Sequence, residues 1–142
     1  MNASKLFELC STLVMPAWLL LIVLPRAKWT RIIAAYAVPS ALALVYLTLL
    51  ATNRFPEGGG FSSLAQVERL FSSEWLLLAG WIHYLAFDLF VGAWEVRDAA
   101  RLGIPHGYVI PCLILTFLLG PIGLLLYFFI RAAVVRRAPA RA

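Results

Sequence analysis

One apolar stretch of this sequence, residues 75–94, contains two side chains that could do acid-base chemistry, Asp88 and His83. If the stretch is helical, successive residues lie 100° apart around the axis. Four polar or aromatic side chains then fall within about 60° of one another on a single face: Trp81, Tyr84, Asp88 and Glu95. His83 and Phe87 lie to one side of this stripe, and His83 is about 140° from Asp88.

An ionised carboxylate near mid-membrane costs on the order of 2.5 to 3.5 kcal/mol to insert. Asp88 is therefore expected to face the bundle interior, a partner or a polar cavity, or to stay protonated. A protonated carboxylic acid in an apolar pocket is a good general acid, and a neutral imidazole such as His83 is a candidate base. The alternative is structural: Asp88 pairs with an arginine such as Arg97, and His83 only hydrogen-bonds a carbonyl.

Metal ligation is only weakly indicated. The residues that could serve as ligands are His83, Asp88, Glu95, Asp98 and His106. None of them stands at an HxxxH, HxxE or HExxH spacing, and the sequence has no serine elbow, phosphate loop or dinucleotide fingerprint. We therefore predict no metal site, and the sequence identifies no cofactor.

Four segments are long and apolar enough to be spanning helices, which need about 20 residues each. They are residues 6–24, 32–51, 75–94 and 109–130. Pro16 and Pro39 are expected to kink the first two, and Gly120-Pro121 interrupts the fourth. A charged loop is predicted after residue 94.

A different pattern covers residues 61–71. Apolar side chains recur there at helical spacing with Gln66, Glu68 and Arg69 between them, and Ser62 or Ser63 could cap the segment. The pattern favours a short amphipathic helix in the membrane interface over a solvated loop helix. The predicted fold is an all-α polytopic bundle of four transmembrane helices plus this interfacial helix.

The composition indicates a membrane protein. Hydrophobic residues make up 63% of the 142 residues and charged residues 13%, whereas soluble domains are about half apolar and a quarter charged. The net charge is +5, and the basic residues lie between and after the apolar runs. This placement favours anionic lipid over nucleic acid as the partner. The first apolar segment has no small-residue cleavage site, so we interpret it as a retained helix.

The predicted organisation is one transmembrane domain, residues 1–131, and a basic flexible tail, residues 132–142. Four spans place both termini on one side of the membrane. The basic residues then conflict, because the connection after the first span (Arg26, Lys28, Arg31) and the arginine-rich tail cannot both be cytoplasmic. We favour a cytoplasmic tail. The oligomeric state is not predicted.

Several motifs of this sequence resemble those of the abscisic-acid-deficient-four-like family. The longest is residues 78–98, LAGWIHYLAFDLFVGAWEVRD. Shorter matches are FSSL at 61–64, IPH at 104–106, Pro111-Cys112, and TFLLGPIGLLL at 116–126. Plant members of this family are plastid membrane proteins linked to the synthesis of neoxanthin from violaxanthin. The resemblance therefore implies a carotenoid or related isoprenoid as the substrate class.

Neoxanthin formation from violaxanthin is an isomerisation, in which an epoxide opens and a proton is lost to give an allene. Such a step needs an acid and a base. The resemblance implies Asp88 and His83 in these roles, with Glu95 in reserve. The aromatic side chains of the motif are the substrate-binding candidates: Trp81, Tyr84, Phe87 and Trp94, with Phe90 as a further wall of the groove.

Two other functions stay open. The protein could be a non-catalytic pigment- or lipid-binding or assembly protein, or a small transporter built around Asp88. The chain shows no transit peptide and is rich in Ala, Leu and Arg, so we expect a bacterial member in the inner membrane. Whether it is an enzyme is not decided by the sequence.

Overall fold

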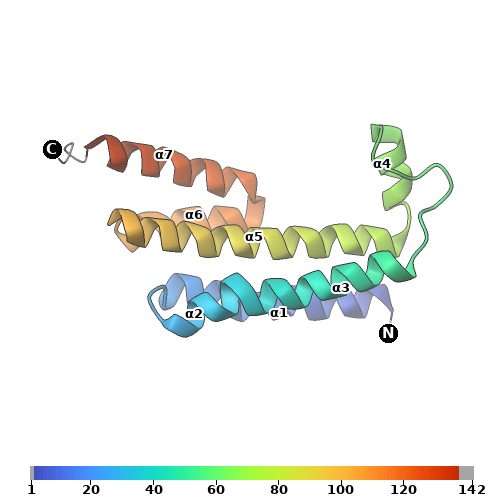
Figure 1. The fold of residues 1–142 in the computed structure, drawn as a ribbon, viewed down its shortest axis with the longest axis horizontal. Helices are drawn as coiled ribbons and strands as arrows, with labels where there is room; N and C mark the ends of the chain where they lie inside the picture. Colours follow the sequence, from blue (N-terminus) through green and yellow to red (C-terminus); the bar gives the residue numbers. More distant parts are fainter. Residues whose placement is uncertain (1, 138–142) are drawn as a thin grey trace.

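The computed structural model describes residues 2–137, and every regular element in that part of the chain is a helix. Three long helical segments lie side by side along the longest axis, a short helix crosses one end, and a helical pair completes the molecule (Figure 1). The elements are α1 (Ala3–Val23), α2 (Lys28–Ile32), η1 (Ile33–Ala37), α3 (Val38–Thr52), α4 (Leu64–Phe71), α5 (Glu74–Leu102), α6 (His106–Leu119) and α7 (Pro121–Arg137). The all-α prediction is confirmed.

Three helical segments are long and apolar enough to cross a membrane: α1, the continuous helix Lys28–Thr52, and α5. The outer surface of the bundle carries large apolar side chains, among them Leu44 at 65% exposure and Phe129 at 67%. In water such a surface would be unfavourable, whereas lipid tails solvate it well. The molecule is therefore a membrane-associated helical bundle.

The second long helix contains a π-helical turn, η1, directly before Pro39. A proline ring crowds the carbonyl four residues earlier, here that of Ala35, and has no N–H to donate. A wider π turn relieves this crowding, so the helix continues to Thr52 instead of breaking. The proline expected to kink this span is thus accommodated inside a continuous helix.

The third span is longer than the sequence predicted. Helix α5 continues to Leu102, so the prediction of a charged loop after residue 94 is wrong. Glu95 and Asp98 belong to this helical extension and are 0% and 6% exposed. They are buried because α6 and α7 pack against α5 along this part of its length.

The predicted fourth span is not a single helix. Residues 109–130 form parts of two helices, α6 and α7, which turn back on each other at Gly120 (Figure 1). Gly120 has φ +46°, a backbone conformation that other residues rarely adopt. A methyl group on Gly123 would lie 2.6 Å from the Cys112 carbonyl oxygen, so α7 starts in direct contact with α6. We call this pair the α6–α7 hairpin.

The hairpin reaches only half-way along α5. Its tip, Gly120, lies against Asp88, the middle residue of α5, and α7 returns past Trp94 and Asp98. Irregular backbone at membrane depth is stable only where protein or a polar cavity covers it, and Gly120 is buried. Within residues 2–137, neither helix of the hairpin is among those long and apolar enough to cross a membrane.

This arrangement corrects the predicted topology. Helix α1 begins at the end where α4 lies, and α7 ends at the opposite end (Figure 1), whereas four spans would have placed the start of the first and the end of the last at the same end. The connection that follows α1 and the end of α7 lie at the same end of the bundle. The two basic segments are therefore no longer in conflict. Residues 132–137 of the predicted flexible tail are helical, and residues 138–142 lie outside the described part.

The predicted amphipathic helix is present as α4. Ser63 caps it by accepting a hydrogen bond from the Gln66 N–H at 3.3 Å. Leu70 is buried against the bundle while Leu64 is 84% exposed. Helix α4 runs across the bundle axis (Figure 1), the direction that a helix lying in the membrane interface takes.

Candidate functional site

The structure keeps the predicted stripe on one face of α5, which faces α1 and the α6–α7 hairpin. The Trp81 and Tyr84 rings pack together with centroids 5.3 Å apart. The Tyr84 hydroxyl donates to the Phe117 carbonyl oxygen at 3.3 Å and neighbours the Asp88 carboxyl group. The tip of the hairpin at Gly120 covers that carboxyl group. Asp88 therefore lies in a protein-lined position at the middle of α5, one of the helices long enough to cross a membrane.

Two carboxyl groups on this face have an oxygen without a partner. Glu95 is completely buried, and its Oε1 accepts from the Thr116 hydroxyl at 3.0 Å. Among residues 2–137, nothing donates to Glu95 Oε2 or Asp88 Oδ2. The two residues are seven positions apart, or about 10 Å along the helix. Burying an unpaired polar oxygen costs stability, so these groups are the strongest candidates for a functional role.

Asp98, one turn beyond Glu95, is paired with α7 through one of its oxygens. Its Oδ2 accepts from the Tyr127 hydroxyl at 2.8 Å and from Arg131 Nε at 2.7 Å. Both donors belong to α7, and Tyr127 is completely buried. Asp98 therefore fastens the returning helix of the hairpin to α5, which is a structural role.

Replacing Asp98 with alanine is expected to destabilise the protein by about 1 to 3 kcal/mol, because the buried Tyr127 hydroxyl loses its acceptor. Thermal unfolding of the purified protein in detergent measures the effect. The control is Glu68→Ala, which removes an exposed carboxyl group from α4 and is expected to change stability by less than about 0.5 kcal/mol. Equal stability of the two variants would contradict the fastening role of Asp98.

His83 lies on another flank of α5 from Asp88. Its ring is exposed and stacks with Phe87 and Tyr46, at centroid distances of 4.5 and 5.7 Å. The two predicted acid-base partners are thus not brought together. Trp94 is also apart from the others, packed against Tyr127 of α7 at 5.4 Å. Of the four predicted binding residues, only Trp81 and Tyr84 are in mutual contact.

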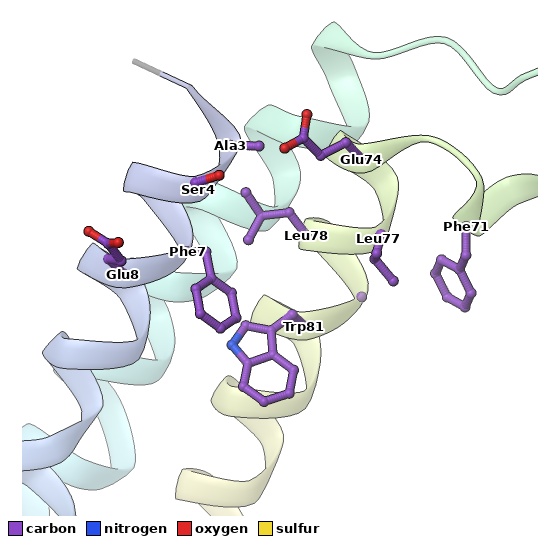
Figure 2. Close-up of a pocket in the computed structure, with 10 residues that line it drawn as sticks. Ala3, Ser4, Phe7, Glu8, Phe71, Glu74, Leu77, Leu78 and Trp81 are labelled. Atoms are coloured by element: carbon purple, nitrogen blue, oxygen red, sulfur yellow. The ribbon is translucent and has the colours of Figure 1, made fainter.

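A cavity of about 570 Å³ lies among α1, α4 and α5, at the end away from the hairpin (Figure 2). Its walls are mainly apolar: Ala3, Phe7, Phe71, Leu77, Leu78, Gly80 and Trp81, with Ser4, Glu8 and Glu74 also lining it. Figure 2 shows the Phe7 and Trp81 rings side by side, and their centroids are 5.3 Å apart. Trp81 is held by a hydrogen bond of 3.1 Å to the Ser11 hydroxyl.

Trp81 links the cavity to the carboxyl groups. It lines the cavity and also contacts Tyr84, beyond which lies Asp88. The cavity itself stops at Trp81. Further along, the hairpin packs onto α1 and α5, with Phe117 against Trp18 at 5.5 Å. The groove between α1 and α5 is therefore open in one half of the membrane and filled by the hairpin in the other.

The described residues contain no cluster of three His, Cys, Asp or Glu side chains that could hold a metal ion. Cys10 and Cys112 are both buried and free. His106 instead bonds the Ile22 carbonyl oxygen through Nε2 at 2.9 Å, which ties the start of α6 to the end of α1.

Together, the fold and the site define a helical membrane protein with a half-depth hairpin over buried carboxyl groups and an apolar cavity beside them. The chain belongs to the ABA DEFICIENT 4-like family, whose model matches residues 5–127, so the resemblance is confirmed. It is 30% identical over 141 residues to Protein ABA DEFICIENT 4, chloroplastic, of Arabidopsis thaliana. The match covers 93% of this chain and 63% of that relative's length. No solved structure matches the chain.

The expected bacterial origin gains no support from these comparisons. The matched relative is a chloroplast protein, so an inner-membrane location in a bacterium has no support from it. Membrane association itself rests on the three long apolar helices.

Proposed function

We propose that this protein binds a carotenoid-like isoprenoid at the open groove between α1 and α5 and isomerises it by acid-base chemistry at Asp88. The observation that carries the proposal is the Asp88 carboxyl group at the middle of α5, with one oxygen that nothing in residues 2–137 hydrogen-bonds. It lies on the helix face that also lines the apolar cavity through Trp81. Family membership supports the substrate class, since the family's plant members are linked to neoxanthin synthesis.

The proposed reaction is an epoxide opening without net redox change. Protonated Asp88 gives its proton to the epoxide oxygen while the carbon–oxygen bond breaks. A proton then leaves a neighbouring carbon, its electron pair forms the new double bond, and the elemental composition stays the same. General acid catalysis of this kind needs the donor within hydrogen-bond reach of the oxygen. Because Gly120 covers Asp88, the hairpin tip has to shift when the reactive end of the substrate arrives.

Glu95 is the candidate acceptor for the proton lost from carbon. It lies on the same face as Asp88, about 10 Å further along α5, and one of its oxygens has no donor within the described chain. Because Glu95 is completely buried under α6, the hairpin has to move away from α5 before this carboxyl group can reach the substrate. His83 would reach a substrate only from the flank of α5 that faces α3. The arrangement therefore favours two carboxyl groups over a carboxyl–imidazole pair.

A non-catalytic binding role is the second candidate, and one observation favours it. The cavity ends at Trp81, and Asp88 does not line it. An apolar ligand could therefore occupy the cavity that Phe7 and Trp81 line without meeting Asp88. In that case the protein would hold a pigment or lipid and leave it unchanged.

A pigment profile separates the two candidates. The protein is expressed in hosts that accumulate β-carotene, zeaxanthin or violaxanthin, and the extracts are compared with those of an empty vector. Isomerisation by epoxide opening predicts a new pigment of unchanged mass in the violaxanthin host and none in the other two, because β-carotene and zeaxanthin have no epoxide. Binding alone predicts that purified protein carries unchanged pigment.

Filling the cavity with Leu77→Trp is expected to reduce either signal, whereas Leu44→Trp, at an exposed position of α3, serves as the control. An unchanged profile and pigment-free protein in all three hosts would contradict both.

A further inference from the structure

We infer that the end of the bundle reached by α7 is a binding surface for the headgroups of anionic lipids. Three segments lie at this end: the connection after α1, the last turns of α5 and the second half of α7, which the hairpin returns to it. Each contributes cations, and we call the set the basic face. Its residues are Arg26, Lys28, Arg31, Arg97, Arg101, Arg131 and Arg136.

The positive charge of the basic face is almost unopposed. Asp98 is the single acidic residue among these segments apart from the buried Glu95, and it is already paired with Arg131 at 2.7 Å. That ion pair is the only one in the described part of the chain. Arg26, Lys28 and Arg136 are exposed and free to meet anions from outside the protein.

The opposite end of the molecule has a different charge balance. Four acidic residues there accompany three basic ones: Glu8, Glu57, Glu68 and Glu74 with Lys5, Arg54 and Arg69. Among the residues whose side chains the structure describes, the basic face therefore has seven cations and two carboxyl groups, whereas acidic residues outnumber basic ones at the opposite end. A charge difference of this kind distinguishes the two leaflets of a bilayer.

Aromatic side chains place the basic face at headgroup depth. Trp29 is 62% exposed, and the Lys28 ammonium lies 5.3 Å from its ring centroid. Tyr108, at the start of α6, is 61% exposed. Exposed Trp and Tyr at helix ends occupy the membrane–water interface. The Arg97 guanidinium lies 5.9 Å from the Phe90 ring, as in a side chain that extends along apolar surface toward the interface.

The occupant that fits is therefore a lipid with a phosphate headgroup and net negative charge, in the leaflet that the basic face contacts. Basic residues flanking membrane helices also set orientation, since they are retained on the cytoplasmic side. In a bacterial expression host, the basic face is thus expected to face the cytoplasm and the α4 end the periplasm.

The test reconstitutes the protein in phosphatidylcholine nanodiscs with increasing fractions of phosphatidylglycerol and measures the lipid retained on the released protein by native mass spectrometry. Two triple variants remove equal charge from opposite ends. They are Arg26→Gln/Lys28→Gln/Arg31→Gln on the basic face and Lys5→Gln/Arg54→Gln/Arg69→Gln at the other end. Thermal unfolding in pure phosphatidylcholine checks that both fold like the wild type.

The wild type and the control triple are expected to retain phosphatidylglycerol preferentially, while the basic-face triple loses this preference roughly tenfold or more. If the basic-face triple fails to fold, Arg136→Gln alone is compared with Arg54→Gln. Equal loss from the two ends would overturn the assignment, because binding would then follow net charge rather than a surface. Equal retention of the two lipids by the wild type would overturn it as well.

Discussion

Replacing Gly123 with alanine is expected to cost roughly 3 kcal/mol of stability or more, because the added methyl group has no room. It would collide with the backbone N–H and hydroxyl of Thr116 and lie 2.6 Å from the Cys112 carbonyl oxygen. Most of these atoms are backbone of α6 and cannot rotate away. The two helices of the hairpin must separate, and thermal unfolding in detergent measures the loss.

Gly107→Ala is the matched control in the same pair of helices. A methyl group there meets nothing within 4 Å, and Gly107 is the second residue of α6. Alanine favours a helix over glycine by about 1 kcal/mol at most, so this variant is expected to be unchanged or slightly more stable. Similar behaviour of Gly107→Ala and Gly123→Ala would contradict a tightly packed hairpin and favour a single bent span.

Replacing Asp88 with asparagine is expected to abolish pigment conversion while the protein stays folded. Asparagine keeps the shape of the side chain but has no acidic proton to give, and loss of a general acid lowers rates by about 10² to 10⁴. Folding is preserved because nothing in the described chain donates to Asp88 Oδ2, so no bond is lost there. Chromatography of the pigments, normalised to the amount of membrane-inserted protein, gives the readout.

Two further variants define which residues accompany Asp88. Glu95→Gln is expected to lower conversion, since it removes the second carboxyl group of the face that contacts the hairpin. His83→Ala is expected to leave conversion intact, since that ring stacks on Phe87 on another flank of α5. If His83→Ala lost conversion while Glu95→Gln kept full activity, the result would favour Asp88 and His83 as the acid-base pair instead. Full activity of Asp88→Asn would rule out the proposed acid.

Much of the fold could be predicted from sequence because hydropathy and helical spacing report directly on lipid exposure. The first three spans, the amphipathic helix and its serine cap follow from those patterns. The hairpin does not follow from hydropathy or helical spacing, because residues 109–130 are apolar throughout whether they cross the membrane or turn back. Gly120-Pro121 marks the interruption, and only the close contact at Gly123 decides between a kink and a full reversal.

The candidate site was predictable to the extent that it lies on one helix. Helical periodicity correctly grouped Tyr84, Asp88 and Glu95 and separated His83 from them. The partners from other helices could not be found this way, because Thr116 faces Glu95 only once α5 extends past residue 95 and the chain turns back into α6 at Gly103. The walls of the cavity from α1 and α4 were missed for the same reason. Their apolar side chains look like any lipid-facing residues until the packing is known.

The half-depth hairpin gives the molecule different widths in the two leaflets. Within the hydrocarbon layer, helices α1, α2, α5, α6 and α7 occupy the side of the basic face, whereas α1, α3 and α5 occupy the other, where α4 lies across the end of the bundle. A helix with its side chains is about 10 Å across, so the difference in cross-section is on the order of 150 Å². The protein is therefore wedge-shaped within the bilayer. It should accumulate where the membrane curves so that the basic leaflet is the more expanded one, independently of any ligand it binds.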